Sequence, residues 1–571
     1  MAFLAVPQGL AYATIAGLPP VVGLYASILP PIAGSLLRSS RHVVAGPTNA
    51  LSLLVGAAVV ATHAGPPVEV ALTLAVMVGV LQIAAGALRL GRVVSYVSSS
   101  VVLGYISGAA VLIGAGQLSN LTGTEGARGT LWIMIRAWAQ GLSAISSVAV
   151  AVGLVTLLIF AGIRWFNRRR GRTVPGALVA MALVTAGSWA LGLESQGLRV
   201  IGDISPIEGN FPPFQVPRFD TAISLLPLAV ACAVLSLIES SSVARAIAAR
   251  NGDQIDISRE FVGQGAANLV AGFFSGYPVS GSLGRSALNE RAGAQTRFSG
   301  ALSGVLLFLM VAGMGGAINH TPIASLAGIL FVIAFDLVDV PGIRRAVRAS
   351  RGDALAFVST LIGTCSMRLD WAIYLGIGVS LVLHLRRARI LVVRELVLTR
   401  QGRMREGDPG LNRGDDELPR CGKVRILHVE GSLFFGSADE LRTAIDRMSN
   451  QPGVEALVVR LKRTSGMDAS CATVLADAAA SMRARGLHLV LAGLSRSSYE
   501  VLERGGALEV IGRAHAFETQ ETWLAALDAA RVHAMAQCGG PCAQCPWRDG
   551  RSFLPPAVAV EENVPAPAAV R

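Results

Sequence analysis

Residues 281–289, with the sequence GSLGRSALN, place one arginine among small and polar residues. They lie in a region where apolar stretches of membrane-spanning length follow one another, and a charge at that depth is expensive and usually functional. Ser282 stands where a helix N-cap belongs, so Arg285 falls in the first turn of the helix. A helix N-terminus carries about half a positive charge and unpaired N–H groups, and Arg285 adds a full charge to it. This pattern predicts an anion-binding site.

A second interrupted segment matches the first. Residues 45–62 (AGPTNALSLLVGAAVVAT) form the third apolar segment and residues 280–294 (SGSLGRSALNERAGA) the tenth, and Thr48 stands at the other N-cap position. Each helix would be about 20 Å long against a hydrocarbon core of about 30 Å, so each begins near mid-membrane. Interruptions at matching positions of two halves mark the substrate site of many transporters. The alternatives are ordinary packing helices and, for Arg285, a loop arginine that sets topology.

A carboxylate follows a long apolar run in the segment LSLIESSSVARAIAARNG, residues 235–252. This residue, Glu239, is too deep for a loop, and carboxylates inside membranes are rare and functional by default. We predict that Glu239 carries a proton during transport. The alternative is an ion pair with a nearby arginine.

These residues belong to a chain with the composition of a polytopic membrane protein. Of 571 residues, 52% are hydrophobic and only 15% are charged, against about 25% charged in soluble proteins. Spans of about 20 apolar residues, some of them shorter, fit about fourteen times between residue 1 and about residue 393. We expect a transmembrane domain over residues 1–394, a linker over 395–420 and a soluble domain after it.

The net charge of +12 comes from arginines that set topology, since they cluster after even-numbered spans. Positively charged loops stay in the cytoplasm, so these loops and the C-terminal domain are expected there. This distribution argues against nucleic-acid binding. The clusters lie at residues 38–41, 89–92, 164–172, 245–250, 285–297, 344–351 and 386–394.

Four sequence blocks resemble the signature blocks of the SulP sulfate-permease family: PQGLAYATIAGLPPVVGLYASILPP, SSRHVVAGPTNALSLL, ESSSVARAIAARNG and GYPVSGSLGRSALNERAGAQTRFSG. The resemblance covers residues 1 to about 394. It implies a seven-plus-seven inverted repeat divided into core and gate parts, in the inner membrane of the cell. It also implies that the anion sits between the third and tenth helices and moves by an elevator-like displacement.

The resemblance carries site residues over by position. The pattern around Glu239 is similar to that of proton-coupled sulfate members, and Gly284 stands where many members have serine. The family also has a complete first helix, whereas only about 17 apolar residues precede the first turn here, so we expect the natural start to lie upstream of Met1. The residues expected at the anion site are Gln8, Tyr12, Thr48, Ser282, Gly284, Arg285 and Ser286.

Residues 421–531 alternate strand-like and helical stretches, which predicts a small α/β domain. With GSLFFGSADEL and GMDASCATVL it resembles the STAS domain attached to SulP transporters. The serine that is phosphorylated in related anti-sigma antagonists is Ala469 here, with Ser470 next, so we expect dimerisation or regulatory docking rather than a phospho-switch. A homodimer is the expected assembly.

The tail, residues 532–571, contains His533, Cys538, Cys542 and Cys545, a spacing that can supply four zinc ligands. The rest of the tail has the composition of a disordered segment. We therefore expect a flexible tail with reduced cysteines, no bound metal or cofactor, and no disulfide in the cytoplasm.

Together these features predict a secondary active transporter of a small oxyanion, first of all proton-coupled sulfate uptake. Bicarbonate or C4-dicarboxylate transport is the alternative within the family. A nucleobase permease of related fold would carry a carboxylate on the tenth helix and lack the STAS domain. A membrane scaffold or sensor acting through the STAS domain is an alternative of another class. No nucleophile–base pair or phosphate loop suggests an enzyme.

Overall fold

The computed structural model describes residues 1–62, 65–91, 98–171, 174–398, 404–407, 421–522, 524–540 and 545. The chain divides into two compact units, Met1–Leu381 and Val382–Arg571, and each is described by itself.

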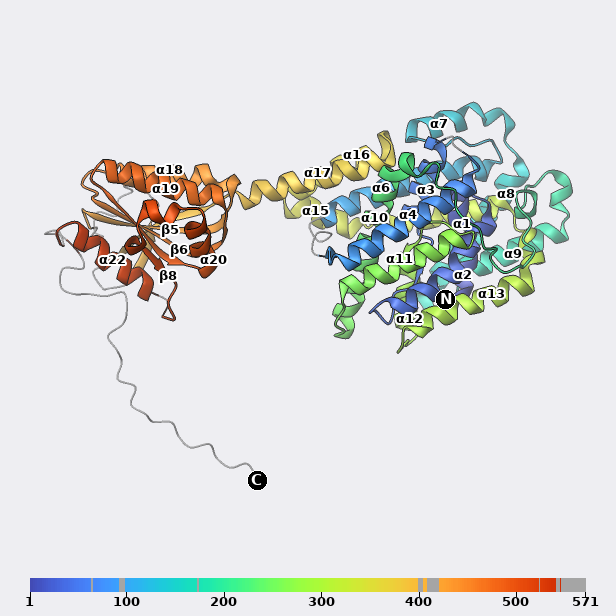
Figure 1. The fold of residues 1–571 in the computed structure, drawn as a ribbon. Coiled ribbons are helices and arrows are strands. Elements are labelled where there is room, and N and C mark those ends of the chain that lie inside the picture. Colours follow the sequence, from blue (N-terminus) through green and yellow to red (C-terminus); the bar gives the residue numbers. More distant parts are fainter. Residues whose placement is uncertain are drawn as a thin grey trace, which may run out of the picture. The chain divides into compact units, whose positions relative to one another are not determined.

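The first unit is a bundle of helices (Figure 1). Its described residues also form a two-stranded sheet. Its first half contains α1 (Ala2–Ala16), α2 (Pro20–Leu37), β1 (Ala45–Gly46), α3 (Asn49–Thr62), α4 (Pro67–Ala87), α6 (Ser99–Thr122), α7 (Leu131–Gln140), α8 (Ser147–Arg170) and α9 (Gly176–Ala190). Its second half contains α10 (Ala222–Asn251), α11 (Ile257–Phe273), β2 (Ser280–Gly281), α12 (Leu283–Arg291), α13 (Phe298–Asn319), α14 (Ile323–Leu337), α15 (Val340–Ala349), α16 (Arg351–Ser366) and α17 (Leu369–Ala388).

The helices pack in two groups. Helices α1 to α4 contact one another and α10, α11 and α13, whereas α6, α8 and α9 pack with α14 and α16. If the largely exposed α7 and α15 are left out, the described part of this unit has seven helices in each half. The first four helices of each half then make up one group, in which α12 contacts α10. The last three make up the other, in which Gly376 of α17 lies against Val101 of α6 and Thr360 of α16. This is the predicted seven-plus-seven repeat with core and gate parts.

Glycines let helices of the first group approach closely, as is common in membrane bundles. A Cβ on Gly79 of α4 would lie 2.8 Å from the carbonyl oxygen of Gly265 of α11, and one on Gly265 would lie 2.7 Å from that of Gly79. Helices α1 and α2 meet in the same way, since a Cβ on Gly23 would lie 1.9 Å from the oxygen of Gly9. Side chains at these positions would force the backbones apart.

Eight helices of the described part are long and apolar enough to cross a membrane, and α1, α3 and α9 are shorter apolar helices. Large apolar side chains such as Leu158 of α8, Leu309 of α13 and Phe335 of α14 lie on the outside of the bundle. An apolar surface of this kind is typical of helices that face the hydrocarbon core of a membrane. The unit is a multi-pass membrane domain.

The second unit is an α/β domain with a six-stranded sheet in the order β4-β3-β5-β6-β7-β8 (Figure 1). Strands β5 to β8 are parallel, and β3 is antiparallel to both neighbours. The strands are β3 (Val392–Leu398), β4 (Met404–Gly407), β5 (Val424–Leu433), β6 (Ala456–Met467), β7 (His488–Leu494) and β8 (Ala516–Glu518). The helices are α18 (Ala438–Ser449), α19 (Ala469–Ala484), α20 (Arg496–Arg504), α21 (Ala507–Ile511) and α22 (Ala525–Gln537).

Two segments differ from the expected boundaries. Part of β3 and all of β4 lie in the segment expected to be a linker, residues 395–420, because the alternating sequence VVRELVL pairs with β5. Helix α22 runs into the expected flexible tail and packs on β5 to β8. Residues 408–420, Cys542 and residues 546–571 lie outside the described residues.

Candidate functional site

The two predicted half-helices start from a shared strand pair. Strand β1 pairs antiparallel with β2, with Ala45 opposite Gly281, and the amide of Ser282 donates to the carbonyl of Val44 at 3.0 Å. Helices α3 and α12 each begin within three residues of this ladder, so their N-termini lie close together. Because the strands are antiparallel, the helices leave in opposite directions. With 14 and 9 residues they are about 21 and 14 Å long, well short of a full span.

Buried polar side chains hold β2 from the α11 and α10 sides. Asn268 receives the amide hydrogen of Val279 at 2.7 Å and donates to its carbonyl at 3.0 Å. Gln264 and Ser236 donate to the same carbonyl at 2.8 and 3.0 Å. We call Ser236, Gln264 and Asn268 the β2 clamp. The sequence alone does not reveal this clamp, because its side chains are distant along the chain and meet only after α11 packs.

Strand β1 is held in a similar way. Arg38, expected among the cytoplasmic arginines, is fully buried, donates to the carbonyl of Val43 at 3.1 Å and lies 4.0 Å from Glu260. The hydroxyl of Ser286 receives the amide hydrogen of Val44 at 3.0 Å. Ser286, expected to line the anion site, therefore supports the strand pair in this structure.

Arg285 bridges the two helix starts. Its guanidinium donates to the carbonyl of Pro47, just ahead of α3, at 3.1 Å. A Cβ on Gly46 would lie 2.1 Å from Nη2 of Arg285, so a side chain there would displace the guanidinium from this position. The Nε of Arg285 is buried and has no hydrogen-bond partner among the described residues. Ser282 caps α12 as expected, since its hydroxyl accepts the amide hydrogen of Arg285 at 3.5 Å.

Glu239 lies at the start of α3. The hydroxyl of Thr48, a residue expected at the anion site, donates to the carboxylate of Glu239 at 3.1 Å. Glu239 is half-buried on α10. Within the described ranges no ion pair joins Glu239 to Arg285 or to any other cation within 4.0 Å. The simple ion-pair interpretation of Glu239 therefore has no support in this geometry.

The remaining expected residues lie on the first turns and on α1. Gln8 is half-buried and Tyr12 buried on α1, which packs on α3. The side-chain oxygens of Gln8 and Asn49 are buried without a partner in the described part of the chain. Gly284 is exposed, and a Cβ there would meet no atom within 4 Å. Asn49, the first residue of α3, was not among the predicted site residues, although its place directly after Gly-Pro-Thr is a usable signal.

The arrangement suits an anion. Two helix N-termini contribute about one positive charge together and the Arg285 guanidinium contributes another. Glu239, when ionised, sets one negative charge against them. An amide side chain offers two N–H donors as well as an oxygen, so Gln8 and Asn49 can turn a donor toward a bound oxyanion.

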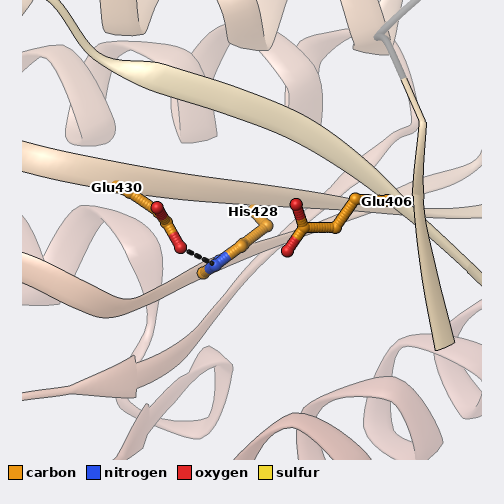
Figure 2. Close-up of side chains that lie close together, drawn as sticks. All are labelled: Glu406, His428 and Glu430. Atoms are coloured by element: carbon orange, nitrogen blue, oxygen red, sulfur yellow. Dashed lines mark hydrogen bonds and ion pairs between the residues drawn. The ribbon is translucent and has the colours of Figure 1, made fainter.

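A separate cluster of potential metal ligands lies on the sheet of the second unit. The ligand atoms of Glu406, His428 and Glu430 are within 4.8 Å of one another, and Figure 2 shows the imidazole between the two carboxyl groups. However, Nη1 of Arg460 lies 3.3 Å from both ring nitrogens, and Arg463 pairs with Glu430. Two guanidinium groups this close oppose a cation, so we interpret the cluster as an ion-pair network.

The electrostatics of this network follow from those contacts. Burial and the charge of Arg460 lower the pKa of His428. The hydrogen bond from Arg463 lowers the pKa of Glu430. His428 is therefore neutral and Glu430 ionised near pH 7.

The residues that the STAS resemblance aligns with a phosphorylated serine lie at the start of α19. Asp468 caps α19 by accepting the amide hydrogen of Cys471 at 3.0 Å, and Ala469 and Ser470 form the exposed first turn.

Comparisons with known proteins agree with this architecture. The model of the Sulfate permease family matches residues 1–360, and that of the STAS domain matches residues 417–522. A probable sulfate transporter of Mycobacterium tuberculosis is 28% identical over 529 residues, which cover 90% of this chain and 92% of the relative.

Solved structures share the fold. Murine Solute Carrier 26 family member A9, an anion transporter in the inward-facing state, matches with a TM-score of 0.83 at 19% identity, over 94% of this chain and 90% of that chain. The transmembrane domain of BicA, a cyanobacterium bicarbonate transporter, matches with a TM-score of 0.58 at 24% identity, over 66% of this chain and 94% of that chain. The chain therefore belongs to the sulfate permease family and carries a C-terminal STAS domain.

Proposed function

We propose that this protein is a secondary active transporter that takes up a small oxyanion, sulfate first, together with protons. The observation that carries the proposal is the buried Arg285 between two helix N-termini, with Glu239 hydrogen-bonded at one of them. Membership of a permease family supports a transport role rather than an enzymatic one, and a relative named as a sulfate transporter favours sulfate.

The coupling follows from charge. An ionised Glu239 opposes an incoming anion, whereas a protonated Glu239 leaves the field of Arg285 and the helix ends unopposed. Proton and anion therefore strengthen each other's binding, and by linkage the effect is reciprocal. The Thr48 hydroxyl can donate to the ionised carboxylate and accept from the protonated one, so it serves both states.

The membrane potential makes such coupling useful. Moving a dianion into a cell against 100 mV costs about 4.6 kcal/mol, and one accompanying proton offsets about half of this. In this proposal the STAS domain lies in the cytoplasm and the protein works as a homodimer in the inner membrane.

Uptake of radiolabelled sulfate into proteoliposomes, with and without an inward proton gradient, tests the proposal. We expect accumulation only with the gradient. Glu239→Gln, which imitates the protonated carboxyl, should keep sulfate exchange but lose gradient-driven accumulation, and Arg285→Ala should lose both. Glu69→Gln, at an exposed ion pair of α4, and Arg291→Ala, at the exposed end of α12, are the matched controls.

Four outcomes would contradict this assignment. Gradient-driven accumulation by Glu239→Gln would remove Glu239 from coupling. Wild-type sulfate affinity in Arg285→Ala would remove the anion site. If bicarbonate or a C4-dicarboxylate outcompetes sulfate, the substrate is that anion. Bicarbonate is one of the competing anions in this test because the chain is similar to the transmembrane domain of a bicarbonate transporter. A full cellular phenotype with transport-dead Arg285→Ala would favour the scaffold or sensor alternative.

A further inference from the structure

A large cavity lies at the end of the membrane domain opposite the arginine-rich loops. It has a volume of about 690 Å³, and none of the residues expected at the anion site lines it. Its lining includes Gly17, Pro67, Arg128 and Arg199, which lie at the first, third, fifth and seventh connections between spans. These are odd-numbered connections, which the distribution of arginines places outside the cell. The cavity therefore faces the external solution.

A buried apolar layer separates this cavity from the expected anion site. Ile15 of α1, Leu53 of α3 and Leu112 of α6 line the cavity, belong to one apolar cluster and are at most 9% exposed. Ile15 is three residues beyond Tyr12 on α1. Leu53 is four residues beyond Asn49 on α3. Each is thus about one helical turn, roughly 5–6 Å, further out than a residue at the expected anion site.

Two arginines without partners line the cavity. The odd-numbered connections contain only five arginines: Arg128, Arg136, Arg199, Arg218 and Arg368. Arg218 and Arg368 pair with carboxylates. Neither Arg128 nor Arg199 has a carboxylate within 4.0 Å, or a side-chain hydrogen bond, in the described part of the chain. Their meeting at one cavity is not explained by topology, which favours few arginines on this side.

The neighbouring groups leave the cavity with positive charge. Arg128 lies over Gly17, which ends α1, since a Cβ on Gly17 would lie 2.4 Å from its Nη1. The C-terminal end of that helix offsets part of one charge. Glu125 is the one acid among the described lining residues, so two guanidinium groups stand against one carboxylate. The amide side chains of Gln117 and Asn120 also line the cavity and add N–H donors.

We propose that this cavity is an outer binding site for a small oxyanion, where Arg128 and Arg199 collect the ion from the external solution. Guanidinium groups match the geometry of oxyanions and stay charged at any physiological pH. Both arginines are exposed to water, so the attraction should weaken as the ionic strength rises. That the ion then moves on to Arg285 rests on the proposed function, whereas the binding site itself does not.

A cysteine at position 116 can report on the cavity. Gly116 lines it, and a Cβ there would meet no atom within 4 Å. Gly116→Cys is labelled in spheroplasts with an anionic or a cationic methanethiosulfonate that does not cross the membrane. Relative to a free thiol, we expect the anionic reagent to react faster than the cationic one. Replacing both arginines, by Arg128→Gln with Arg199→Gln, should slow the anionic reagent roughly fivefold at low ionic strength, the effect of two charges about 8 Å away in water.

Matched variants and a competing anion make the test specific. Arg136→Gln removes an exposed arginine of the same side that does not line the cavity, so it should leave both rates unchanged. Asn210→Cys, at an exposed residue outside the cavity, should react at rates that do not depend on the two arginines. Excess sulfate at constant ionic strength should slow the anionic reagent at Gly116→Cys, also in an Arg285→Ala background that lacks the inner anion site.

Each result decides for or against the outer site. Equal rates with and without the two arginines would overturn it, and so would a rate that sulfate does not change. A Gly116→Cys protein that neither reagent labels would show that the cavity is closed to the external solution, which also overturns the site. If the double glutamine variant fails to fold, sulfate protection of Gly116→Cys decides alone. None of these measurements requires transport, so a lack of sulfate uptake would contradict the proposed function and leave the outer site standing.

Discussion

Three buried side-chain atoms that lack a partner in the described part of the chain lie where the anion is expected to bind. Arg285 Nε, Asn49 Oδ1 and Gln8 Oε1 are buried without partners among the described residues, whereas the side chains of the β2 clamp are hydrogen-bonded. A buried polar atom without a partner costs about 1–3 kcal/mol. A bound oxyanion can accept a hydrogen bond from Arg285 Nε directly, and from Gln8 and Asn49 once their amide N–H groups turn toward it, so binding would recover part of this cost.

Gly284 offers room for a further donor. A serine there would add a hydroxyl in the first turn of α12 without meeting any atom within 4 Å. A hydrogen bond to a charged group is worth about 1.5–3 kcal/mol, so we expect Gly284→Ser to lower the Kd for sulfate about tenfold. Sulfate binding to the purified protein, measured by calorimetry, gives the value.

Gly281→Ser is the matched control for this substitution. Its Cβ would lie 2.9 Å from Cα of Ser240, so the variant should lower the unfolding temperature. A stable Gly284→Ser protein with unchanged sulfate affinity would show that position 284 does not face the anion.

His428 makes the second unit sensitive to pH. Because burial and Arg460 lower its pKa, the folded domain binds fewer protons than the unfolded chain below about pH 6.5. Stability should therefore fall as the pH drops from 7.5 to 5.5. His515, whose pKa burial also lowers, contributes with the same sign. Glu430, whose pKa is lowered, loses its contribution only below about pH 4.5.

Calorimetric unfolding of this unit at several pH values checks the prediction. His428→Gln should make the dependence between pH 7.5 and 5.5 shallower, and His515→Gln measures the share of the other histidine. An identical pH dependence in wild type and His428→Gln would contradict it.

The sequence predicts the chemistry of single residues better than their contacts. Arg285 and Glu239 stand out because charge is rare inside apolar segments. By contrast, Thr48 occupies the expected position but uses its hydroxyl for Glu239, and Ser286 supports β1. Those partners come from other segments of the chain, so local spacing contains no information about them.

At the scale of elements, the helix bundle tolerates a larger residue in place of glycine only where no neighbouring helix lies close to that glycine. Gly23→Ala would place a Cβ 1.9 Å from the carbonyl oxygen of Gly9, and overpacking of this kind costs about 1–3 kcal/mol. We expect a lower unfolding temperature in detergent for Gly23→Ala. Gly116→Ala on α6, where a Cβ meets no atom within 4 Å, should leave it unchanged or raise it. Equal unfolding temperatures for the two variants would contradict the close approach of α1 and α2.

The half-helices show what an apolar pattern can and cannot predict about elements. Their place as the third and tenth segments follows from Gly-Pro and Gly-Tyr-Pro breaks at matching positions. The strand pair β1–β2 does not follow, because each strand has only two residues and its partner is in the other half of the chain. Strands β3 and β4 escaped notice for a similar reason, since their pairing with β5 and with each other decides their structure.

At the scale of the molecule, the two units have separate cores. The apolar clusters of the first contain buried residues up to Ile373, and those of the second begin at Leu391. We therefore expect a fragment of residues 382–571 to fold alone, with one cooperative thermal transition by circular dichroism. A chain ending after α17 at Ala388 should bind sulfate with a Kd within about twofold of the full-length value. An unfolded fragment would show that the second unit requires the membrane domain.

The strand pair also has a consequence for biogenesis. Ala45 and Gly46 have no ladder partner until Ser280 and Gly281 have been synthesised. At 5–20 residues per second, translation takes roughly 10–50 s to cover that distance. Throughout this interval the backbone groups at the start of α3 lie without their partner strand in a segment bound for the bilayer, where an unpaired backbone group costs several kcal/mol. The insertion machinery or trapped water has to shelter them, and a ribosome that stalls between the two halves releases a chain that cannot close its own binding site.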